Sequence, residues 1–308
     1  MTQHKSNIRN YDICCIGHIT LDKIITPHFT AQMPGGTAYY FAKALKNFDH
    51  SGFHLITSIG ETEMDVIREL QSDGIDVTVI PSRKSVCFEN KYGDDMNERA
   101  QRVLAKADPF MAAKIPEINS RIYHLGTLLA DDFDLEVIKK LSGNGIVSVD
   151  VQGFLRKVDG ERVVPVDYHK KIEALPYISI LKANEMEMET LTGTTDPKKA
   201  AYMLYDWGCP EIILTLGSKG SIIYAHGKFY DIPAFPPDKL IDATGCGDTY
   251  MAGYLYMRSK GATYEEAGSF AAAMCSIKLS KTGPFASTIQ DVKSLITKCM
   301  SLSSGNHS

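Results

Sequence analysis

The sequence lacks any long hydrophobic run, and no stretch approaches the roughly 20 apolar residues that a membrane helix needs. Its first ten residues, MTQHKSNIRN, are polar and contain no apolar core of the kind found in signal peptides. Neither sign of charge dominates, because 33 Lys and Arg stand against 37 Asp and Glu and no segment carries a basic stripe. We therefore expect a cytoplasmic protein that binds neither membranes nor nucleic acid.

Cysteine pairs with metal-binding spacing are also lacking. The seven cysteines are scattered and form no C-x-x-C motif, which argues against a zinc site or a disulfide framework. Cys14 and Cys15 are adjacent in an apolar run, and neighbouring strand residues point to opposite faces of a sheet. We expect mostly buried, reduced thiols. Cys246 differs because a helix start lowers the pKa of a thiol, so it is either a reactive thiol or a small spacer.

Two common nucleotide-binding motifs are missing as well. The sequence contains no G-x-x-x-x-G-K-[ST] loop, and no G-x-G-x-x-G follows its first apolar run. The second absence argues against a dehydrogenase that uses a dinucleotide.

Short apolar runs instead alternate with helical patterns along the chain. The apolar runs span residues 11–19, 53–60, 121–129, 145–151, 177–185 and 211–217. The helical patterns span residues 37–48, 64–72, 135–141, 185–191, 197–207 and 250–260. This alternation predicts an α/β fold with a central, mostly parallel sheet, helices on both faces, and sites beyond the carboxyl ends of the strands. The 308 residues, 44% of them hydrophobic, contain no convincing linker and predict a single domain, 1–308.

Two segments interrupt the alternation. Residues 18–36 and 77–105 each have the pattern of strand, turn and strand. They are either two separate surface hairpins or one small β-sheet that covers the site as a lid. We favour the lid because four short strands with an apolar face need a partner surface, whereas an isolated hairpin is marginally stable.

The segment IDATGCGDTYMAGYLYMRSKG (241–261) places three small residues and an aspartate at a predicted helix start. Backbone N–H groups at a helix start are unpaired and carry partial positive charge, and glycine lets an anion approach them closely. The turn therefore has the form of an anion-binding site with the carboxylate of Asp248 at its edge. The competing explanation is an ordinary helix cap with Asp248 as the N-cap residue.

Five stretches, taken in order, resemble the ribokinase-like, or PfkB, family of small-molecule kinases. DATGCGD (242–248) resembles the D-T-x-G-A-G-D signature of that family, and this is the most specific match. The other four stretches are GGTA (35–38), VDVQGFLR (149–156), LKANEMEMETLTG (181–193) and LTLGSKGSIIY (214–224). The resemblance implies a ribokinase-like α/β fold with a β-sheet lid. It also implies a kinase that transfers the γ-phosphate of ATP to an alcohol group.

The resemblance assigns the chemistry to the glycine turn. Asp248 would be the base that takes the proton of the acceptor hydroxyl, and an ordinary Asp pKa of about 3.9 suits this role because the group is ionised at neutral pH. The backbone N–H groups of Gly245, Cys246 and Gly247 would form an anion hole for the transferred phosphoryl group.

ATP and Mg²⁺ are the implied cofactors. Asn184 and Glu187 would organise Mg²⁺ largely through water, although acidic residues in a first helical turn also simply suit the helix dipole. The residues implied in nucleotide binding are Lys182, Asn184, Thr215, Gly217 and Gly220. A tight turn between two strands explains the two glycines equally well. Many family members also bind a monovalent cation, and here Asp242, Thr244 and carbonyls from residues 281–287 are the candidate ligands for K⁺.

The implied acceptor is a sugar, a polyol or a related hydroxylated molecule. Asp22 resembles the aspartate that binds adjacent hydroxyls, since a carboxylate can accept two hydrogen bonds at once. The residues that would complete the acceptor site are Gly35, Gly36, Tyr40, Gln152 and Arg156, with Asp150 close by. A solvent-exposed position is the competing explanation for Asp22, Arg156 and Lys182.

Tyr40 departs from the family pattern and leaves the acceptor open. Sugar kinases of this family have an Asn at that position, four residues past the double glycine, so an aromatic ring replaces an amide. One alternative is a nucleoside kinase in which Tyr39 and Tyr40 stack on a base. Another is a ligand-binding regulatory protein without catalytic activity. The exposed edge of the lid also offers a surface for a homodimer.

Overall fold

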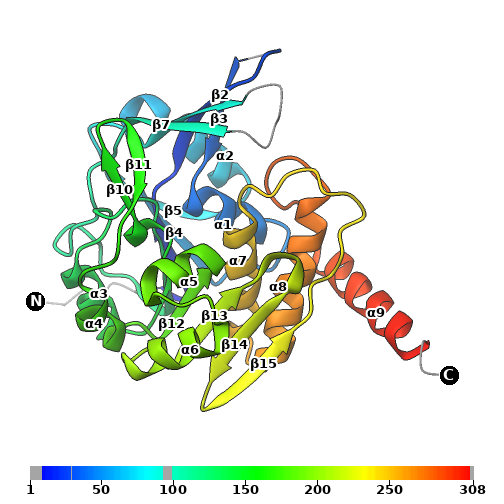
Figure 1. Ribbon diagram of the computed structural model, residues 1–308. Coiled ribbons are helices and arrows are strands. Elements are labelled where there is room, and N and C mark those ends of the chain that lie inside the picture. Colours follow the sequence, from blue (N-terminus) through cyan, green and yellow to red (C-terminus); the bar gives the residue numbers. More distant parts are fainter. Residues whose placement is uncertain (1–8, 29, 93–98, 306–308) are drawn as a thin grey trace, which may run out of the picture.

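The computed structural model describes residues 9–28, 30–92 and 99–305. Nine strands within these ranges form the central sheet, and they are β1 (Asn10–Gly17), β4 (Phe53–Ile59), β5 (Asp76–Pro81), β8 (Asn119–Gly126), β9 (Ile146–Asp150), β12 (Ile180–Asn184), β13 (Glu211–Thr215), β14 (Ser221–Ala225) and β15 (Lys228–Ile232). Their order is β15-β14-β13-β12-β9-β8-β1-β4-β5 (Figure 1). The strands from β13 to β5 are parallel, and β14 and β15 add an antiparallel edge. The predicted mostly parallel sheet is confirmed.

Helices cover both faces of this sheet. One face is covered by α1 (Thr37–Leu45), α2 (Asp65–Ser72), α7 (Cys246–Ser259) and α8 (Tyr264–Leu279), and α9 (Ile289–Gly305) packs against α8. The other face is covered by α3 (Leu135–Ser142), α4 (Lys171–Ala174), α5 (Glu185–Thr192) and α6 (Pro197–Asp206). Cys15 belongs to the first hydrophobic core and Cys14 to the second, so the adjacent thiols point to opposite faces as expected.

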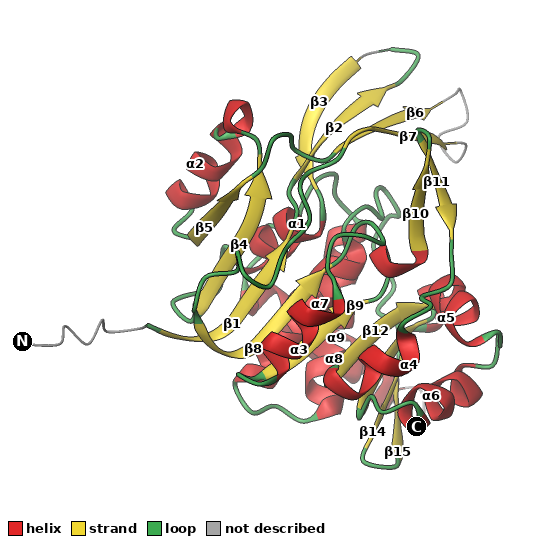
Figure 2. Ribbon diagram, turned by 90° about the vertical axis from the view of Figure 1, so that its left-hand side faces the viewer, coloured by secondary structure: helices red, strands yellow, loops and turns green. Residues whose placement is uncertain are grey.

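A smaller sheet stands above the central one (Figure 2). Its strands are β2 (Thr20–Ile25), β3 (Thr30–Gly35), β6 (Cys87–Tyr92) and β7 (Arg99–Ala105), in the order β3-β2-β6-β7. We call these four strands the lid sheet. The two predicted segments, 18–36 and 77–105, both contribute strands to it because β2 pairs with β6.

The expected boundary of the second lid segment is wrong. Residues 76–81 form β5, which pairs with β4 at the edge of the central sheet instead of joining the lid sheet. Val77 and Val79 pack against the hydrophobic core there, and this burial accounts for the choice of partner. Residues 93–98 of the predicted lid lie outside the described residues.

A hairpin that the sequence analysis did not predict links the body to the lid sheet. Strands β10 (Arg156–Asp159) and β11 (Arg162–Pro165) pair antiparallel and turn at Gly160, which has a φ of 61°. The backbone N–H of Val103 in β7 donates a hydrogen bond to the carbonyl of Glu161 at 2.8 Å. The lid sheet is thereby tied to the strand that begins at Arg156.

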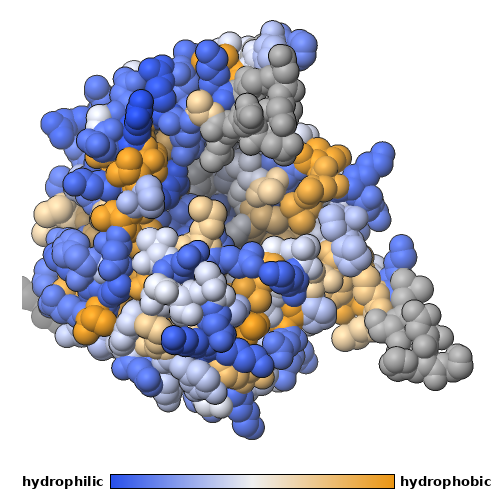
Figure 3. Space-filling view, in the orientation of Figure 1, coloured by the Kyte–Doolittle hydropathy of each residue, from blue (hydrophilic) through white to orange (hydrophobic). Residues whose placement is uncertain are grey.

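The surface is hollowed between the lid sheet and the body of the molecule (Figure 3). The predicted helix after the glycine turn begins earlier than expected, at Cys246, and its N-cap residue is Gly245 with a φ of 73°. This makes Asp248 a residue of the first helical turn, and the alternative in which Asp248 is the N-cap is wrong.

Candidate active site

The glycine turn owes its shape to close contact with Tyr40. Gly245 has a positive φ, and a Cβ on it would overlap the ring of Tyr40. The hydroxyl and N–H of Thr249 both donate to the carbonyl of Gly245, at 2.8 and 2.9 Å, and fix the start of α7. Only glycine therefore meets both the backbone and the packing requirement at position 245.

The first turn of α7 lies directly above a buried ion pair. A Cβ on Gly247 would be 3.0 Å from Nζ of Lys182 and 3.7 Å from Oδ2 of Asp150. Asp150 is the last residue of β9 and Lys182 lies near the end of β12, so the helix start meets the carboxyl ends of two parallel strands. The structure thus brings Gly247, Lys182 and Asp150 together.

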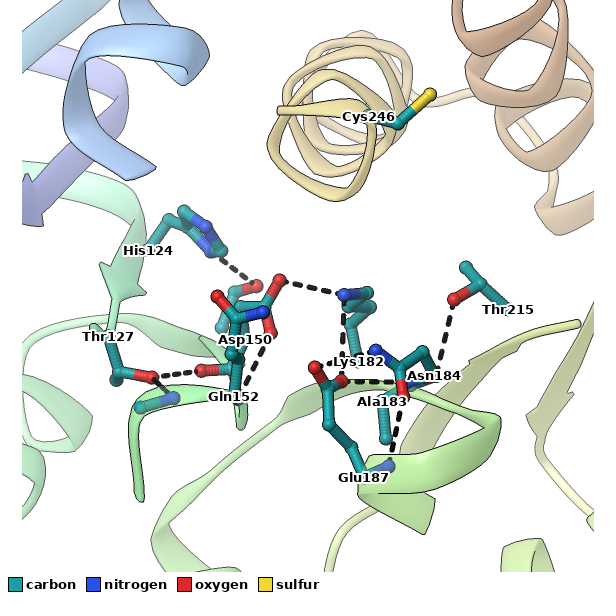
Figure 4. A network of polar contacts seen from close by, with 12 residues as sticks. His124, Thr127, Asp150, Gln152, Lys182, Ala183, Asn184, Glu187, Thr215 and Cys246 are labelled. Atoms are coloured by element: carbon teal, nitrogen blue, oxygen red, sulfur yellow. Dashed lines mark hydrogen bonds and ion pairs between the residues drawn. The ribbon is translucent and has the colours of Figure 1, made fainter. Parts of the chain in front are cut away.

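One of the three amides assigned to the predicted anion hole already has a partner within the turn. Amides in a first helical turn have no partner within their helix, which leaves Gly247 suited to bind an anion. The N–H of Cys246, however, donates to the carbonyl of Ala243 at 3.1 Å. The thiol of Cys246 donates to the carbonyl of Cys275 at 3.8 Å, and its sulfur points away from Lys182 in Figure 4. This geometry favours a spacer over a reactive thiol.

Lys182 is held between carboxylates. Its Nζ lies 3.0 Å from Oδ2 of Asp150 and 3.7 Å from Oε2 of Glu187, and all three side chains are buried (Figure 4). Burial favours the neutral amine, but the carboxylates of Asp150 and Glu187 outweigh it and raise the pKa of Lys182. The ammonium therefore stays charged, and a surface position for Lys182 is wrong.

Asp248 is a half-buried carboxylate beside this ion pair. Burial, followed by repulsion from Asp150, raises its pKa from 3.8 to about 7, even though Lys182 acts in the opposite direction. The ordinary pKa expected from the sequence is therefore wrong. A carboxyl group with a pKa near neutrality is a stronger base than an ordinary Asp, and this suits a group that accepts a proton near pH 7.

Asn184 and Glu187 form a capping box at the start of α5. The N–H of Glu187 donates to Oδ1 of Asn184 at 2.9 Å, and the N–H of Asn184 donates to Oε2 of Glu187 at 2.8 Å. The side-chain amide of Asn184 donates to Oε1 of Glu187, also at 2.8 Å. Burial raises the pKa of Glu187, with Lys182 opposing the shift. The observed role of Asn184 and Glu187 is therefore to cap the N-terminus of α5.

The donor set fits Mg²⁺ held through water. Three carboxyl groups, those of Asp150, Glu187 and Asp248, surround the single ammonium of Lys182, and the charge of Asp150 helps to raise the pKa of Glu187 and of Asp248. Among the described residues no cluster of His, Cys, Asp and Glu could enclose a metal ion. Mg²⁺ needs few protein oxygens because it keeps several waters and binds phosphates, so excess negative charge at the edge of the anion hole is a suitable environment.

Tyr40 contacts the glycine turn, and Asp22, which was also predicted to bind the acceptor, lies close to Tyr40. Tyr40 is half-buried, and burial together with Asp242, Asp22 and Asp248 raises its pKa. A Cβ on Gly35 would lie 3.2 Å from Oδ2 of Asp22, so this carboxylate faces the double glycine. The half-buried Asp22 also accepts a hydrogen bond from the N–H of Phe88 at 3.4 Å. These contacts argue against Asp22 as a mere surface charge.

Tyr39 does not take part in this arrangement. Its side chain is only 5% exposed and belongs to the hydrophobic core, with Nζ of Lys43 5.7 Å from its ring centre. The predicted pair of aromatic rings stacked on a base is therefore wrong, and Tyr40 is the ring beside the turn. Gly36, with a φ of 84°, caps α1, and a Cβ there would lie 2.7 Å from the carbonyl of His18.

Arg156 contacts the lid sheet, and Gln152 contacts Asp150. A guanidinium N–H of Arg156 donates to the side-chain carbonyl of Gln101 in the lid sheet at 2.7 Å, and its guanidinium lies 5.5 Å from the ring centre of Phe88. The N–H of Gln152 donates to Oδ1 of Asp150 at 3.2 Å, and its side chain lies beside that carboxylate (Figure 4). Arg156 thus bridges the body and the lid sheet.

The two glycines of the predicted nucleotide loop have different surroundings. A Cβ on Gly220 would overlap the carbonyl of Ile232, so strand packing alone explains this glycine. Gly217, with a φ of 56°, has open space beside its Cα. Thr215 ends β13 and donates to the carbonyl of Ala183 at 3.5 Å (Figure 4). Thr215 and Gly217 therefore remain the better candidates for contact with a nucleotide.

The K⁺ site predicted at Asp242 and Thr244 does not fit the residues present. Nζ of Lys278 lies 2.8 Å from both the carbonyl oxygen and Oδ2 of Asp242, and the N–H of Thr244 donates to Oδ1 at 2.9 Å. Partial burial opposes ionisation, but the hydrogen bonds from Lys278 and Thr244 together outweigh it and lower the pKa of Asp242. A second cation within about 4 Å of this ammonium would be repelled by about 4 kcal/mol at an effective dielectric constant near 20.

Sequence reasoning missed Lys278 and assigned only a minor role to Asp150. A signal for Lys278 exists, because it is the single charge in the otherwise small and apolar helical stretch AAAMCSIKL (271–279). Asp150 is fixed by Thr127, whose hydroxyl donates to the carbonyl of Asp150 at 2.6 Å and accepts from the N–H of Gly153 at 2.7 Å (Figure 4).

A hollow of about 500 Å³ between β7 and the β10–β11 hairpin contains none of the predicted site residues.

A mostly parallel sheet, a lid sheet and a glycine turn beside a carboxylate define a ribokinase-type kinase of small molecules. The chain belongs to the pfkB family of carbohydrate kinases, whose family model matches residues 11–291. It is 28% identical to the cytidine kinase of Thermococcus kodakarensis over 83% of this chain and 91% of that protein. It is 27% identical to the nucleoside kinase of Methanocaldococcus jannaschii over 88% of this chain and 91% of that protein.

A similar solved structure is the sulfate complex of a pyrophosphate-dependent kinase of the ribokinase family. It is 28% identical, has a TM-score of 0.80, and covers 91% of this chain and 99% of its own. The chain is accordingly a small-molecule kinase with the ribokinase fold. In the part of the chain that the structure describes, no helix is long and apolar enough to cross a membrane.

Proposed function

We propose that this protein transfers the γ-phosphate of ATP to a hydroxyl of a sugar, polyol or nucleoside, with Asp248 as the base. The observation that supports this most strongly is the position of Gly247. Its Cα lies over the Lys182–Asp150 ion pair, and the carboxyl group of Asp248 follows it directly in the chain. A phosphoryl group at the helix start would meet backbone N–H groups, while its attacking hydroxyl would meet a base.

The chemistry then follows from these groups. The acceptor hydroxyl gives its proton to a carboxylate oxygen of Asp248 as its oxygen forms a bond to phosphorus. The bond from phosphorus to the leaving oxygen breaks, and the electron pair stays with the nucleoside diphosphate. The N–H groups of the turn and the ammonium of Lys182 stabilise the negative charge of the transferred group. Asn184 and Glu187 would hold Mg²⁺ through water, and the ion would supply positive charge to neutralise the phosphates.

The phosphate donor needs its own test. ATP is favoured by the loop that carries Thr215 and Gly217, because open space beside Gly217 allows a ligand to approach the backbone. Pyrophosphate is the competing donor, because similar structures of known kinases are described as pyrophosphate-dependent, one of them with myo-inositol bound.

The position of Tyr40 restricts which class of molecule can be the acceptor. Its ring contacts the turn that would hold the transferred phosphoryl group, so it would touch the part of the acceptor that bears the reacting hydroxyl. Asp22, facing Gly35, would bind neighbouring hydroxyls. A ribosyl or cyclic polyol ring meets both requirements. Two relatives named as cytidine and nucleoside kinases make a nucleoside the second candidate acceptor.

A matrix of acceptors and donors tests these proposals. Ribose, fructose, myo-inositol, cytidine and adenosine are each incubated with Mg·ATP or with Mg·pyrophosphate, and phosphorylated products are identified by mass. A product formed with ATP and one acceptor supports the proposal, and a product formed only with pyrophosphate overturns the donor assignment. Binding of an acceptor without turnover from either donor would instead support a regulatory protein that binds ligands without catalysis.

We further infer a reducing, cytoplasmic location. The seven cysteines are an odd number, are scattered along the chain and form no C-x-x-C motif, which is typical of a protein whose thiols stay reduced. Homodimerisation through the lid sheet stays a prediction. Strand β3 is one of the two edge strands of that sheet and could pair with the lid sheet of a second copy. Sedimentation analysis of the purified protein tests it directly.

A further inference from the structure

Lys278 is a buried lysine that the catalytic scheme does not use. It lies at the end of α8, and its side chain is 0% exposed. Its Nζ donates to the backbone carbonyl of Asp242 and to Oδ2 of the same residue, both at 2.8 Å. A lysine is almost never fully buried unless it is paired, so the burial of Lys278 depends on its contact with Asp242.

The contact joins three segments around the glycine turn. Oδ1 of Asp242 accepts the N–H of Thr244 at 2.9 Å, within the turn itself. Oδ2 accepts the N–H of Gly283 at 3.2 Å, from the loop after α8. The N–H of Asp242 in turn donates to the carbonyl of Leu279 at 3.3 Å. Asp242 thereby sets the path of the chain three residues before Gly245.

The chemistry at Asp242 calls for one positive charge. A carboxylate oxygen and a main-chain carbonyl oxygen of the same residue point to a common position, which is the arrangement that binds a monovalent cation. In this chain the ammonium of Lys278 lies at that position and satisfies both oxygens with N–H donors. Ammonium and K⁺ have similar sizes, so a lysine head group can replace the ion.

We propose that Lys278 is a built-in monovalent cation that positions the Asp242–Gly247 turn, so that this kinase needs no K⁺. Lys278 is a positioning residue, because it acts through Asp242 on the backbone of the turn. The proposal rests on the proposed function only for its rate measurement, and the stability measurement below needs no substrate.

The test removes the ammonium and offers the ion instead. In Lys278→Ala, the vacated space beside Asp242 is expected to bind K⁺ or NH₄⁺, so either ion raises the thermal midpoint of the variant above its value in Na⁺. The wild type is expected to have the same midpoint in all three salts. Lys293→Ala, which removes an exposed lysine from α9, is the matched control and is expected to behave like the wild type.

Turnover gives the second readout. Because a misplacement of about 1 Å costs roughly a hundredfold in rate, Lys278→Ala in Na⁺ is expected to lose about that factor, and K⁺ or NH₄⁺ is expected to restore most of it. Lys278→Met fills the space without charge and is expected to lose rate without recovery in any salt. Activation of the wild type by K⁺ would overturn the proposal. So would a folded Lys278→Ala variant that shows no preference for K⁺ or NH₄⁺ over Na⁺ in its thermal midpoint.

Discussion

Replacing Asp248 with Asn is expected to stabilise the protein, and to do so increasingly as the pH rises. The pKa of Asp248 is raised from 3.8 to about 7 in the folded state by burial and by repulsion from Asp150. The folded protein therefore holds this proton more tightly than the unfolded chain does. Above about pH 7 the carboxyl group is ionised in both the folded and the unfolded state, and its charge then destabilises the folded state by the full amount. This destabilisation decreases as the pH falls from about 7 to about 4.

The size of the effect follows from the shift. A difference of about 3 pKa units corresponds to an upper limit of about 4 kcal/mol at 1.36 kcal/mol per unit. Asp248 is only half-buried, so water screens part of this energy, and we expect about 1–2 kcal/mol. For a chain of 308 residues this raises the thermal midpoint by roughly 2–3 °C above pH 7.

The assay is thermal unfolding of the wild type and of Asp248→Asn without ligands, between about pH 5 and pH 8. The difference in midpoint between the two proteins is expected to widen with pH. Asp238→Asn, an exposed carboxylate in the preceding loop, is the control and is expected to match the wild type throughout. A difference that stays constant with pH, or a variant less stable than the wild type at pH 8, would refute the raised pKa.

Three further substitutions probe the turn and the acceptor side. Gly245→Ala is expected to abolish activity and lower the thermal midpoint, because the new Cβ overlaps the ring of Tyr40 at a positive φ that costs about 1–2 kcal/mol; a variant with wild-type stability contradicts this packing. Tyr40→Asn is expected to change the ranking of acceptors by kcat/KM while the KM for ATP stays near its wild-type value, and equal changes in both would show that Tyr40 does not face the acceptor. Cys246→Ala is expected to keep most of the activity, since the thiol is turned toward Cys275; a large loss would restore the thiol as a reacting group.

Local features of the fold could be predicted from the sequence because their causes are local. The apolar runs predicted six of the nine described strands of the central sheet to within a few residues, since turn residues mark their ends, and the three others are β5, β14 and β15. The start of α5 was marked by Asn184 followed three residues later by Glu187, and these two side chains do form the capping box.

Features that depend on partners distant in the sequence could not be predicted. Strand β5 has the same pattern as a lid strand, and only its fit beside β4 decides its place. The pKa of Asp248 depends on Asp150 and Lys182, which come from two other segments of the chain. The pairing of Lys278 with Asp242 joins residues 36 positions apart, so a lysine in a helical pattern gave no indication of its partner.

Hydrogen bonds between side chains join the lid sheet to the body of the molecule. Arg156 reaches Gln101, and the side-chain amide of Gln101 donates to Asn90 at 2.9 Å. This chain of hydrogen bonds begins at the strand that follows Gln152 and ends in the lid sheet.

The central claim, that Asp248 takes the proton of the acceptor, is tested most directly by single-turnover phosphoryl transfer with Asp248→Asn. Removing a general base typically lowers the rate by about 10²–10⁴-fold, while the amide keeps the shape of the carboxyl group. We expect a loss of this size together with near wild-type affinity for Mg·ATP, measured by calorimetry on the same preparation. Transfer at more than half the wild-type rate would contradict the assignment of Asp248 as the base.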